Sequence, residues 1–102
     1  MYHLDFFEIL NQVIKSQKDM KLFTWITYQF TSNQIEVNIS YSKCSIKISE
    51  NKYKRMIKRL VDLDYLMRIS RGVYRLNPFV YVPYKADASE LQKEWIELKK
   101  QK

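Results

Sequence analysis

The side chains best suited to binding chemistry in this sequence are basic, and they are concentrated in one segment. Residues 43–75 hold ten Lys and Arg against three acids, a net charge of +7, while the other 69 residues balance eight Lys with eight acids. Each phosphate that Lys or Arg neutralises releases condensed counterions, whereas solubility requires no such concentration of charge. The segment therefore predicts a polyanionic partner.

A helix beginning after Ser49 carries much of this charge. Apolar residues follow Ser49 at helical spacing, at Tyr53, Met56, Ile57, Leu60 and Val61. At about 100° per residue the polar and basic positions fall opposite this stripe. The candidate nucleic-acid contacts on this outer face are Asn51, Lys52, Lys54, Arg55, Lys58 and Arg59.

The rest of the charge lies in a predicted β-hairpin, whose strands Tyr65–Ser70 and Val73–Asn77 are joined by Arg71-Gly72. We expect Met67 and Ile69 to face Tyr74 and Leu76 on the inner side. Three further candidate contacts, Arg68, Arg71 and Arg75, then project outward. Lys supplies point charges to phosphates, whereas Arg55 and Asn51 suit bidentate contacts to guanine or adenine edges. The alternative is a solvated helix face with no partner.

Other elements must position this segment. The pattern predicts an amphipathic helix over 4–17, a buried helix over 20–30, a strand over 34–39 and a short helix from Ser40 to residue 46 or 48. After the hairpin, which Asn77-Pro78 closes, residues 79–84 are extended. A last helix is expected from a capping box at Ser89. With 102 residues, 46% of them apolar, the chain is expected to be one domain, 1–102.

The predicted fold class is α+β: a winged helix-turn-helix with extra N-terminal and C-terminal helices. Its order of helices, strand, short helix, basic helix and hairpin is that of proteins whose second helix-turn-helix element enters the major groove. Such a fold places the basic helix and the hairpin on the same nucleic acid.

Three stretches, residues 48–61, 63–66 and 71–78, carry a resemblance to a known family. The last reads Arg71-Gly72-Val73-Tyr74-Arg75-Leu76-Asn77-Pro78 and is similar to the "G-V-Y-x-(I/L)-N-P" wing of replication proteins of small Gram-positive plasmids, the RepL type. The likeness covers roughly residues 34–98. In size and architecture the chain also resembles small winged-helix proteins encoded beside a mobile element's own DNA polymerase, which act as its partner in priming.

The resemblance implies a non-catalytic DNA-binding protein in replication of a plasmid or mobile genetic element. Its partners would be single- or double-stranded DNA and a polymerase, primase or helicase. One alternative is a dimeric transcriptional regulator of the same fold, which would bind a pseudo-palindrome as a homodimer. Another is a protein-interaction subunit whose basic face meets an acidic partner.

Two apolar features have both a binding and a packing interpretation. Tyr74, Phe79, Tyr81 and Tyr84, beside Arg75 and Lys85, form either a stacking platform for single-stranded bases or part of the core. The apolar stripes of the terminal helices form either a docking surface or intramolecular contacts: Leu4, Phe7, Leu10 and Ile14 in the first, Leu91, Trp95 and Leu98 in the last.

Catalysis, cofactors and metals find little support. The sequence has no phosphate-cradling Gly-rich loop, and His3 and Cys44 are its only His and Cys, so neither a Cys/His zinc site nor a disulfide can form within one chain. Cys44 is expected to be a core thiol. No apolar run approaches the ~20 residues of a membrane span, so we expect a cytoplasmic protein that binds no membrane.

Overall fold

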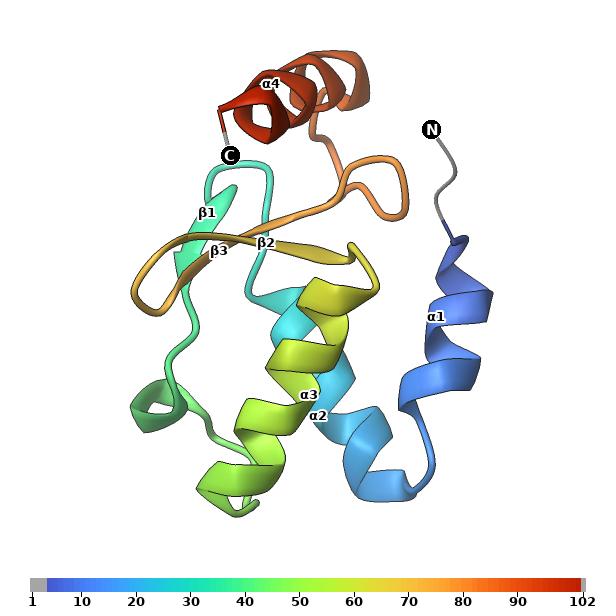
Figure 1. Ribbon diagram of the computed structural model, residues 1–102, viewed down its shortest axis with the longest axis vertical. Helices are drawn as coiled ribbons and strands as arrows, with labels where there is room; N and C mark the ends of the chain where they lie inside the picture. The colour runs from blue at the N-terminus through green and yellow to red at the C-terminus, as the bar shows by residue number, and fades with distance from the viewer. Residues whose placement is uncertain (1–3, 102) are drawn as a thin grey trace.

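The computed structural model describes residues 4–101, which form a small α+β fold in three layers (Figure 1). This range contains α1 (Phe6–Val13), α2 (Gln17–Tyr28), β1 (Glu36–Asn38), the single-turn 3-10 helix η1 (Tyr41–Lys43), α3 (Glu50–Asp62), β2 (Leu66–Ser70), β3 (Val73–Leu76) and α4 (Ala88–Lys100). The element types and their order follow the sequence pattern, apart from the corrections below.

Short polar side chains set where the helices begin. Asp5 and Glu8 form a capping box at the start of α1, and Ser16 caps α2 by accepting a hydrogen bond from the Asp19 amide. The expected first helix, 4–17, therefore ends early at Val13, and the second begins at residue 17 rather than 20. The last helix also begins two residues early, because Asp87 rather than Ser89 is its cap.

The expected short helix after Ser40 is wrong beyond its first turn. Only Tyr41–Lys43 is helical, Ser40 makes no side-chain cap, and residues 44–49 have no regular secondary structure. This stretch contains Ser45, Ser49 and the β-branched Ile46 and Ile48. In a helix, β-branched side chains lose freedom and Ser side chains compete for the backbone hydrogen bonds. The connection from β1 to α3 is thus mostly a loop.

The sheet is antiparallel, with strand order β1-β3-β2. The hairpin and the inner positions of Tyr74 and Leu76 are confirmed, but the predicted inner position of Met67 is wrong. Leu66 lies opposite Leu76 and Met67 lies opposite Arg75, with an irregularity between Arg68 and Ser70. Because neighbouring residues of a strand point to opposite faces, Met67 and Leu76 lie on different sides of the sheet.

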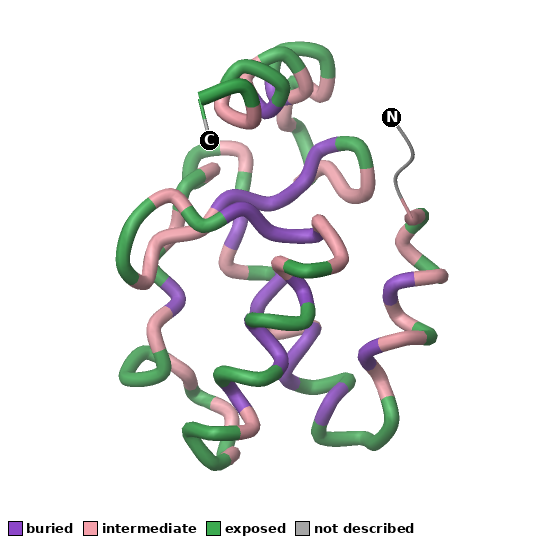
Figure 2. The backbone as a smooth tube through the Cα atoms, in the orientation of Figure 1, coloured by how far each residue is buried: buried purple, intermediate pink, exposed green. Residues whose placement is uncertain are grey.

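Each face of the sheet packs against helices (Figure 1). Leu66 and Leu76 lie in one core cluster with buried residues of α1, α2 and α3, among them the fully buried Leu60. α4 covers the opposite face of the sheet, which carries Met67 and Arg75. The α4 residues Leu91 and Trp95 are buried there. Figure 2 shows stretches of buried residues in α1, α2, α3 and the two hairpin strands.

Asn77 closes the hairpin, as the sequence predicted. It is fully buried. Its side-chain nitrogen Nδ2 donates to the backbone carbonyl of Asp64 at 2.6 Å, and its side-chain oxygen Oδ1 accepts from the backbone amide of Phe79 at 2.9 Å. Asp64 itself adopts a positive φ of 62° in the turn between α3 and β2. One buried amide therefore joins the end of α3 to the end of the hairpin.

Candidate nucleic-acid interface

The outer face of α3 follows from its cap and its apolar stripe. Ser49 caps the helix by accepting from the Lys52 amide at 3.2 Å, which confirms the predicted start. Tyr53, Met56, Ile57 and Leu60 are buried. The opposite side is left to solvent, and it exposes Asn51, Lys54, Arg55, Lys58 and Arg59.

The basic groups of this face differ in how strongly they are held. Two lysines form exposed ion pairs with acids one helical turn away on α3. Lys54 pairs with Glu50 at 3.0 Å, and Lys58 pairs with Asp62 at 3.2 Å. Such pairs typically contribute less than about 1 kcal/mol, so a phosphate competes easily for the lysines. Arg59 donates to the Gln12 side chain at 3.3 Å, and Arg55 makes no ion pair or hydrogen bond within residues 4–101.

Lys52 is the exception on α3, because it turns toward α2. It is half-buried and lies 3.4 Å from the carboxylate of Asp19. Burial works against the charge of Asp19, but the Lys15 amide, the Lys52 ammonium and the Ser16 hydroxyl outweigh it and hold its pKa below the usual value. We therefore assign Lys52 to the packing of α3 on α2.

The tip of the hairpin places Arg71 beside the helix. Gly72 has φ +78°, and a Cβ there would lie 3.3 Å from the side-chain oxygen of Asn38. The carbonyl of Gly72 accepts from the Ile39 amide at 2.9 Å, which ties the tip to the end of β1. Arg71 is exposed, with no ion pair or hydrogen bond in the described part of the chain, and Arg68 is exposed on β2.

The predicted outward position of Arg75 is wrong. Its side chain is 11% exposed and lies between two carboxylates, Glu36 of β1 and Glu94 of α4, each at 3.0 Å. The register that puts Arg75 opposite Met67 turns it to the sheet face that α4 covers. Arg75 therefore links β1, β3 and α4, and the exposed charge of residues 43–75 is smaller than their count suggests.

Three adjoining surface hollows show that the remaining candidates other than Arg68 lie side by side. A groove between η1, α3 and the hairpin tip is lined by Lys54, Lys58 and Arg71 among others. The two lysines also line a second hollow with Asn51 and Arg55. Arg55 and Arg59 line a third, toward α1 and α2. We call this connected surface the basic face: Asn51, Lys54, Arg55, Lys58, Arg59 and Arg71.

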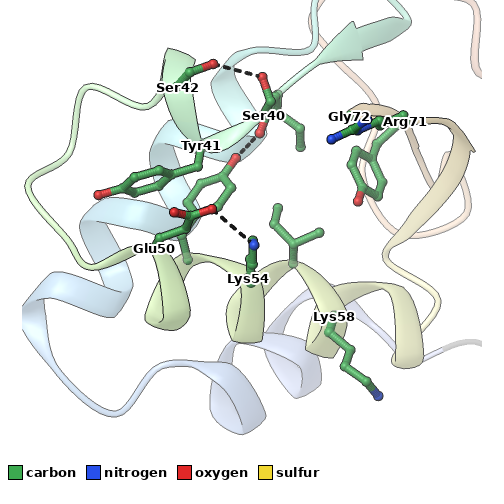
Figure 3. Close-up of a pocket in the computed structure, with 12 residues that line it drawn as sticks. Ser40, Tyr41, Ser42, Glu50, Lys54, Lys58, Arg71 and Gly72 are labelled. Atoms are coloured by element: carbon green, nitrogen blue, oxygen red, sulfur yellow. Dashed lines mark hydrogen bonds and ion pairs between the residues drawn. The ribbon is translucent and has the colours of Figure 1, made fainter.

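The groove also contains residues that the sequence did not single out (Figure 3). Its volume is about 630 Å³, and its lining includes Ser40, Tyr41, Ser42 and Glu50. Lys43 at the end of η1 and Lys47 in the loop that follows are exposed, and neither has an ion pair or hydrogen bond among the residues described. A helix at 40–48 was expected here, and that error concealed that residues 40–42 line a groove with α3.

The four aromatic residues considered as a stacking platform are separated in the structure. Tyr74 lines the groove, whereas Tyr81 packs on the core with its ring 5.6 Å from that of Phe6. Phe79 and Tyr84 are exposed beyond the hairpin, and Lys85 lies over the Tyr84 ring at 5.6 Å. The four rings therefore form no single surface.

The apolar stripes of the terminal helices mostly pack within the chain. Leu91 and Trp95 are buried under the sheet, and Leu4, Leu10 and Ile14 are partly buried against the core. Of the four N-terminal residues considered, Phe7 alone is strongly exposed, at 73%.

Residues 4–101 contain no group of three or more His, Cys, Asp or Glu placed to hold a metal ion. His3 lies outside the described residues. Cys44 is half-buried, and its thiol lies 3.7 Å from the Ile46 carbonyl. In the same range no helix combines the length and apolar character needed to cross a membrane.

Comparison with known proteins adds no relative: no family model, no curated protein and no solved structure matches the chain.

Proposed function

We propose that the chain is a non-catalytic DNA-binding protein of the winged-helix class, in which α3 enters the major groove and the hairpin tip lies on the phosphate backbone. The observation that carries this proposal is the basic face. It joins one helix and one hairpin tip into a continuous cationic surface, and Arg55 and Arg71 have no acidic partner within residues 4–101. A helix and a hairpin side by side match the width of a duplex groove and its flanking strand.

The topology supports the class assignment. A strand before the basic helix pairs with the second strand of the hairpin, giving the order β1-β3-β2. η1 stands in place of the first helix of a helix-turn-helix, shortened to one turn. In this arrangement α1 and α4 are the additions, and α4 lies on the far side of the sheet from α3 (Figure 1).

The roles of individual residues follow from their chemistry. Asn51 near the start of α3 and Arg55 near its middle are suited to bidentate contacts with base edges. Lys54, Lys58 and Arg59 supply charge to phosphates, and Arg71 contacts the backbone from the hairpin tip. Arg68 is exposed on β2 and extends the charge along the hairpin.

The test is a fluorescence-anisotropy titration of labelled duplex DNA at two salt concentrations. The basic face has five cationic side chains, which predicts a salt slope of about −4.5, or about 500-fold weaker binding when salt rises fourfold. Arg55→Ala and Lys58→Ala should each weaken binding severalfold, and Arg71→Ala should do so on every sequence. Lys93→Ala on α4 removes the same charge elsewhere and should leave affinity unchanged. If all four variants bind duplex DNA as tightly as the wild type, the proposal is contradicted.

We further propose a role in replication of a plasmid or mobile element, where the protein delivers DNA to a polymerase, primase or helicase. This rests on the resemblance of residues 48–61, 63–66 and 71–78 to plasmid replication proteins. The stoichiometry of the complex with DNA, measured by light scattering, separates it from the alternative regulator. One copy per site supports an accessory, whereas two copies on a pseudo-palindrome support a dimeric regulator. Failure of DNA to compete with an acidic protein partner would favour an interaction subunit instead.

A further inference from the structure

The groove beside α3 has an apolar floor and a polar rim. Ile39, Ile57 and the rings of Tyr53 and Tyr74 supply apolar surface. The rim carries hydroxyls from the β1–α3 connection, a carboxylate and the Lys54 ammonium from α3, and Arg71, whereas the Lys58 side chain points away from the opening. Figure 3 shows Ser40 and Ser42 on one side of the opening, Glu50 and Lys54 below it and Arg71 opposite.

Hydrogen bonds fix the aromatic walls in place. The Tyr41 hydroxyl donates to the Ile48 carbonyl at 2.7 Å, and the Tyr53 hydroxyl donates to the Ile39 carbonyl. The two rings lie 5.6 Å apart at 57°. Burial raises the pKa of Tyr53 well above its usual range, with smaller contributions from Cys44 and Tyr74, so this hydroxyl remains a donor. The groove is therefore already formed without a ligand.

The Tyr74 hydroxyl and the Arg71 guanidinium are available to a ligand. Neither makes a hydrogen bond or ion pair in the part of the chain that the structure describes. The volume of about 630 Å³ lies within the ~300–1,000 Å³ of small-molecule sites. In a ligand with a flat ring, polar ring edges and an attached anion, the ring would contact the apolar floor, and the polar edges and the anion would contact the rim.

We propose that this groove seats one unpaired nucleotide of a bound DNA strand. Its base would lie against the ring of Tyr74 on the apolar floor, and its phosphate would contact Arg71 and Lys54. The inference rests on the proposed function, because the strand reaches the groove along the basic face, with which the groove shares Lys54 and Lys58.

The composition of the groove favours a nucleotide over a phosphate alone. An isolated phosphate makes no favourable contact with the apolar floor, and the Glu50 carboxylate would repel it. A base offers N–H groups to Glu50 and an aromatic face to the floor, and stacking on protein rings is tolerant of base identity. A fully paired duplex exposes no base face, so the ligand must be unpaired.

The test compares three labelled duplexes of the same sequence: one fully paired, one with a single bulged base, and one with an abasic residue at the bulge. We expect the bulged base to tighten binding about tenfold relative to both others. Tyr74→Leu, which removes the ring but keeps an apolar side chain, should abolish that preference and leave the affinity for paired duplex within about twofold. Tyr28→Leu on α2 makes the same change at an exposed tyrosine outside the groove; it is the matched control and should retain the preference.

Because Tyr74 is partly buried against the core, a second variant at an exposed position fills the groove instead. Ser42→Leu removes only an exposed 3.3 Å hydrogen bond between the Ser42 and Ser40 hydroxyls, so it should abolish the preference with little change in thermal stability. Equal affinity for the bulged-base and abasic duplexes, or a preference that survives in Ser42→Leu, would overturn the inference. If paired duplex binds and depends on Arg55 in either case, the proposed function stands by itself. If no DNA binds, both fail.

Discussion

Arg75→Met separates the structural role of Arg75 from the DNA contact that its sequence position suggests. Arg75 donates one hydrogen bond to Glu36 and one to Glu94, both at 3.0 Å. Hydrogen bonds to charged groups contribute about 1.5–3 kcal/mol each. The glutamate side chains are 42% and 40% exposed and rehydrate when the partner is lost, which reduces each bond to about 1 kcal/mol. Methionine keeps the buried aliphatic stem.

The free energy of unfolding should therefore fall by about 2 kcal/mol in Arg75→Met. For a domain of this size that corresponds to a decrease in melting temperature of about 8–16 °C. Trp95 lies buried on the adjacent helix, so tryptophan fluorescence during urea unfolding reports the same change. Below the melting temperature, the affinity for duplex DNA should change by less than about threefold.

Arg71→Met is the matched control for this prediction. It removes the same charge from the same hairpin, at an exposed residue without a partner in residues 4–101. It should leave stability unchanged and weaken DNA binding. The opposite result, with Arg75→Met as stable as the wild type and strongly impaired in binding, would refute the assignment of Arg75 to the contact with α4.

Three further predictions concern stability. Leu60→Ala, at a fully buried core position, should lower the free energy of unfolding by about 2–5 kcal/mol in urea titrations. Gly72→Ala should lower it by about 1 kcal/mol or more, because φ is +78° and the new Cβ would press on Asn38; a neutral thermal shift would contradict this geometry. The lowered pKa of Asp19 stabilises the fold above the unfolded-state value near 3.8, and this contribution is lost as the pH falls through the lower folded-state pKa. Asp19→Asn should thus be less stable than the wild type at pH 6, and the difference should shrink as the pH approaches 3.

The sequence was sufficient where a pattern and a cap agree. Ser49 and the apolar stripe of α3 correctly predicted that helix and its exposed side, and Arg71-Gly72 correctly predicted the turn of the hairpin. Strand periodicity alone did not reveal which face each hairpin residue occupies. A shift of one residue exchanges the faces, and the buried Leu66 rather than Met67 pairs with Leu76.

Long-range partners were the part that the sequence did not reveal. Arg75 is held by Glu36 and Glu94, which lie 39 and 19 positions away along the chain. Nothing in the local spacing of Arg75 distinguishes it from the exposed Arg71. The groove was likewise missed, because it is assembled from η1, α3 and the hairpin tip, and because the stretch after Ser40 was expected to be helical.

The most direct test of the account is the location of the DNA interface, mapped by amide chemical-shift changes of the labelled protein during titration with duplex DNA. We predict that the changes concentrate in residues 49–59 and 70–73 and spare α1 and α4. Changes centred on α1 or α4, or none at saturating DNA, would contradict the assignment of the basic face as a nucleic-acid interface.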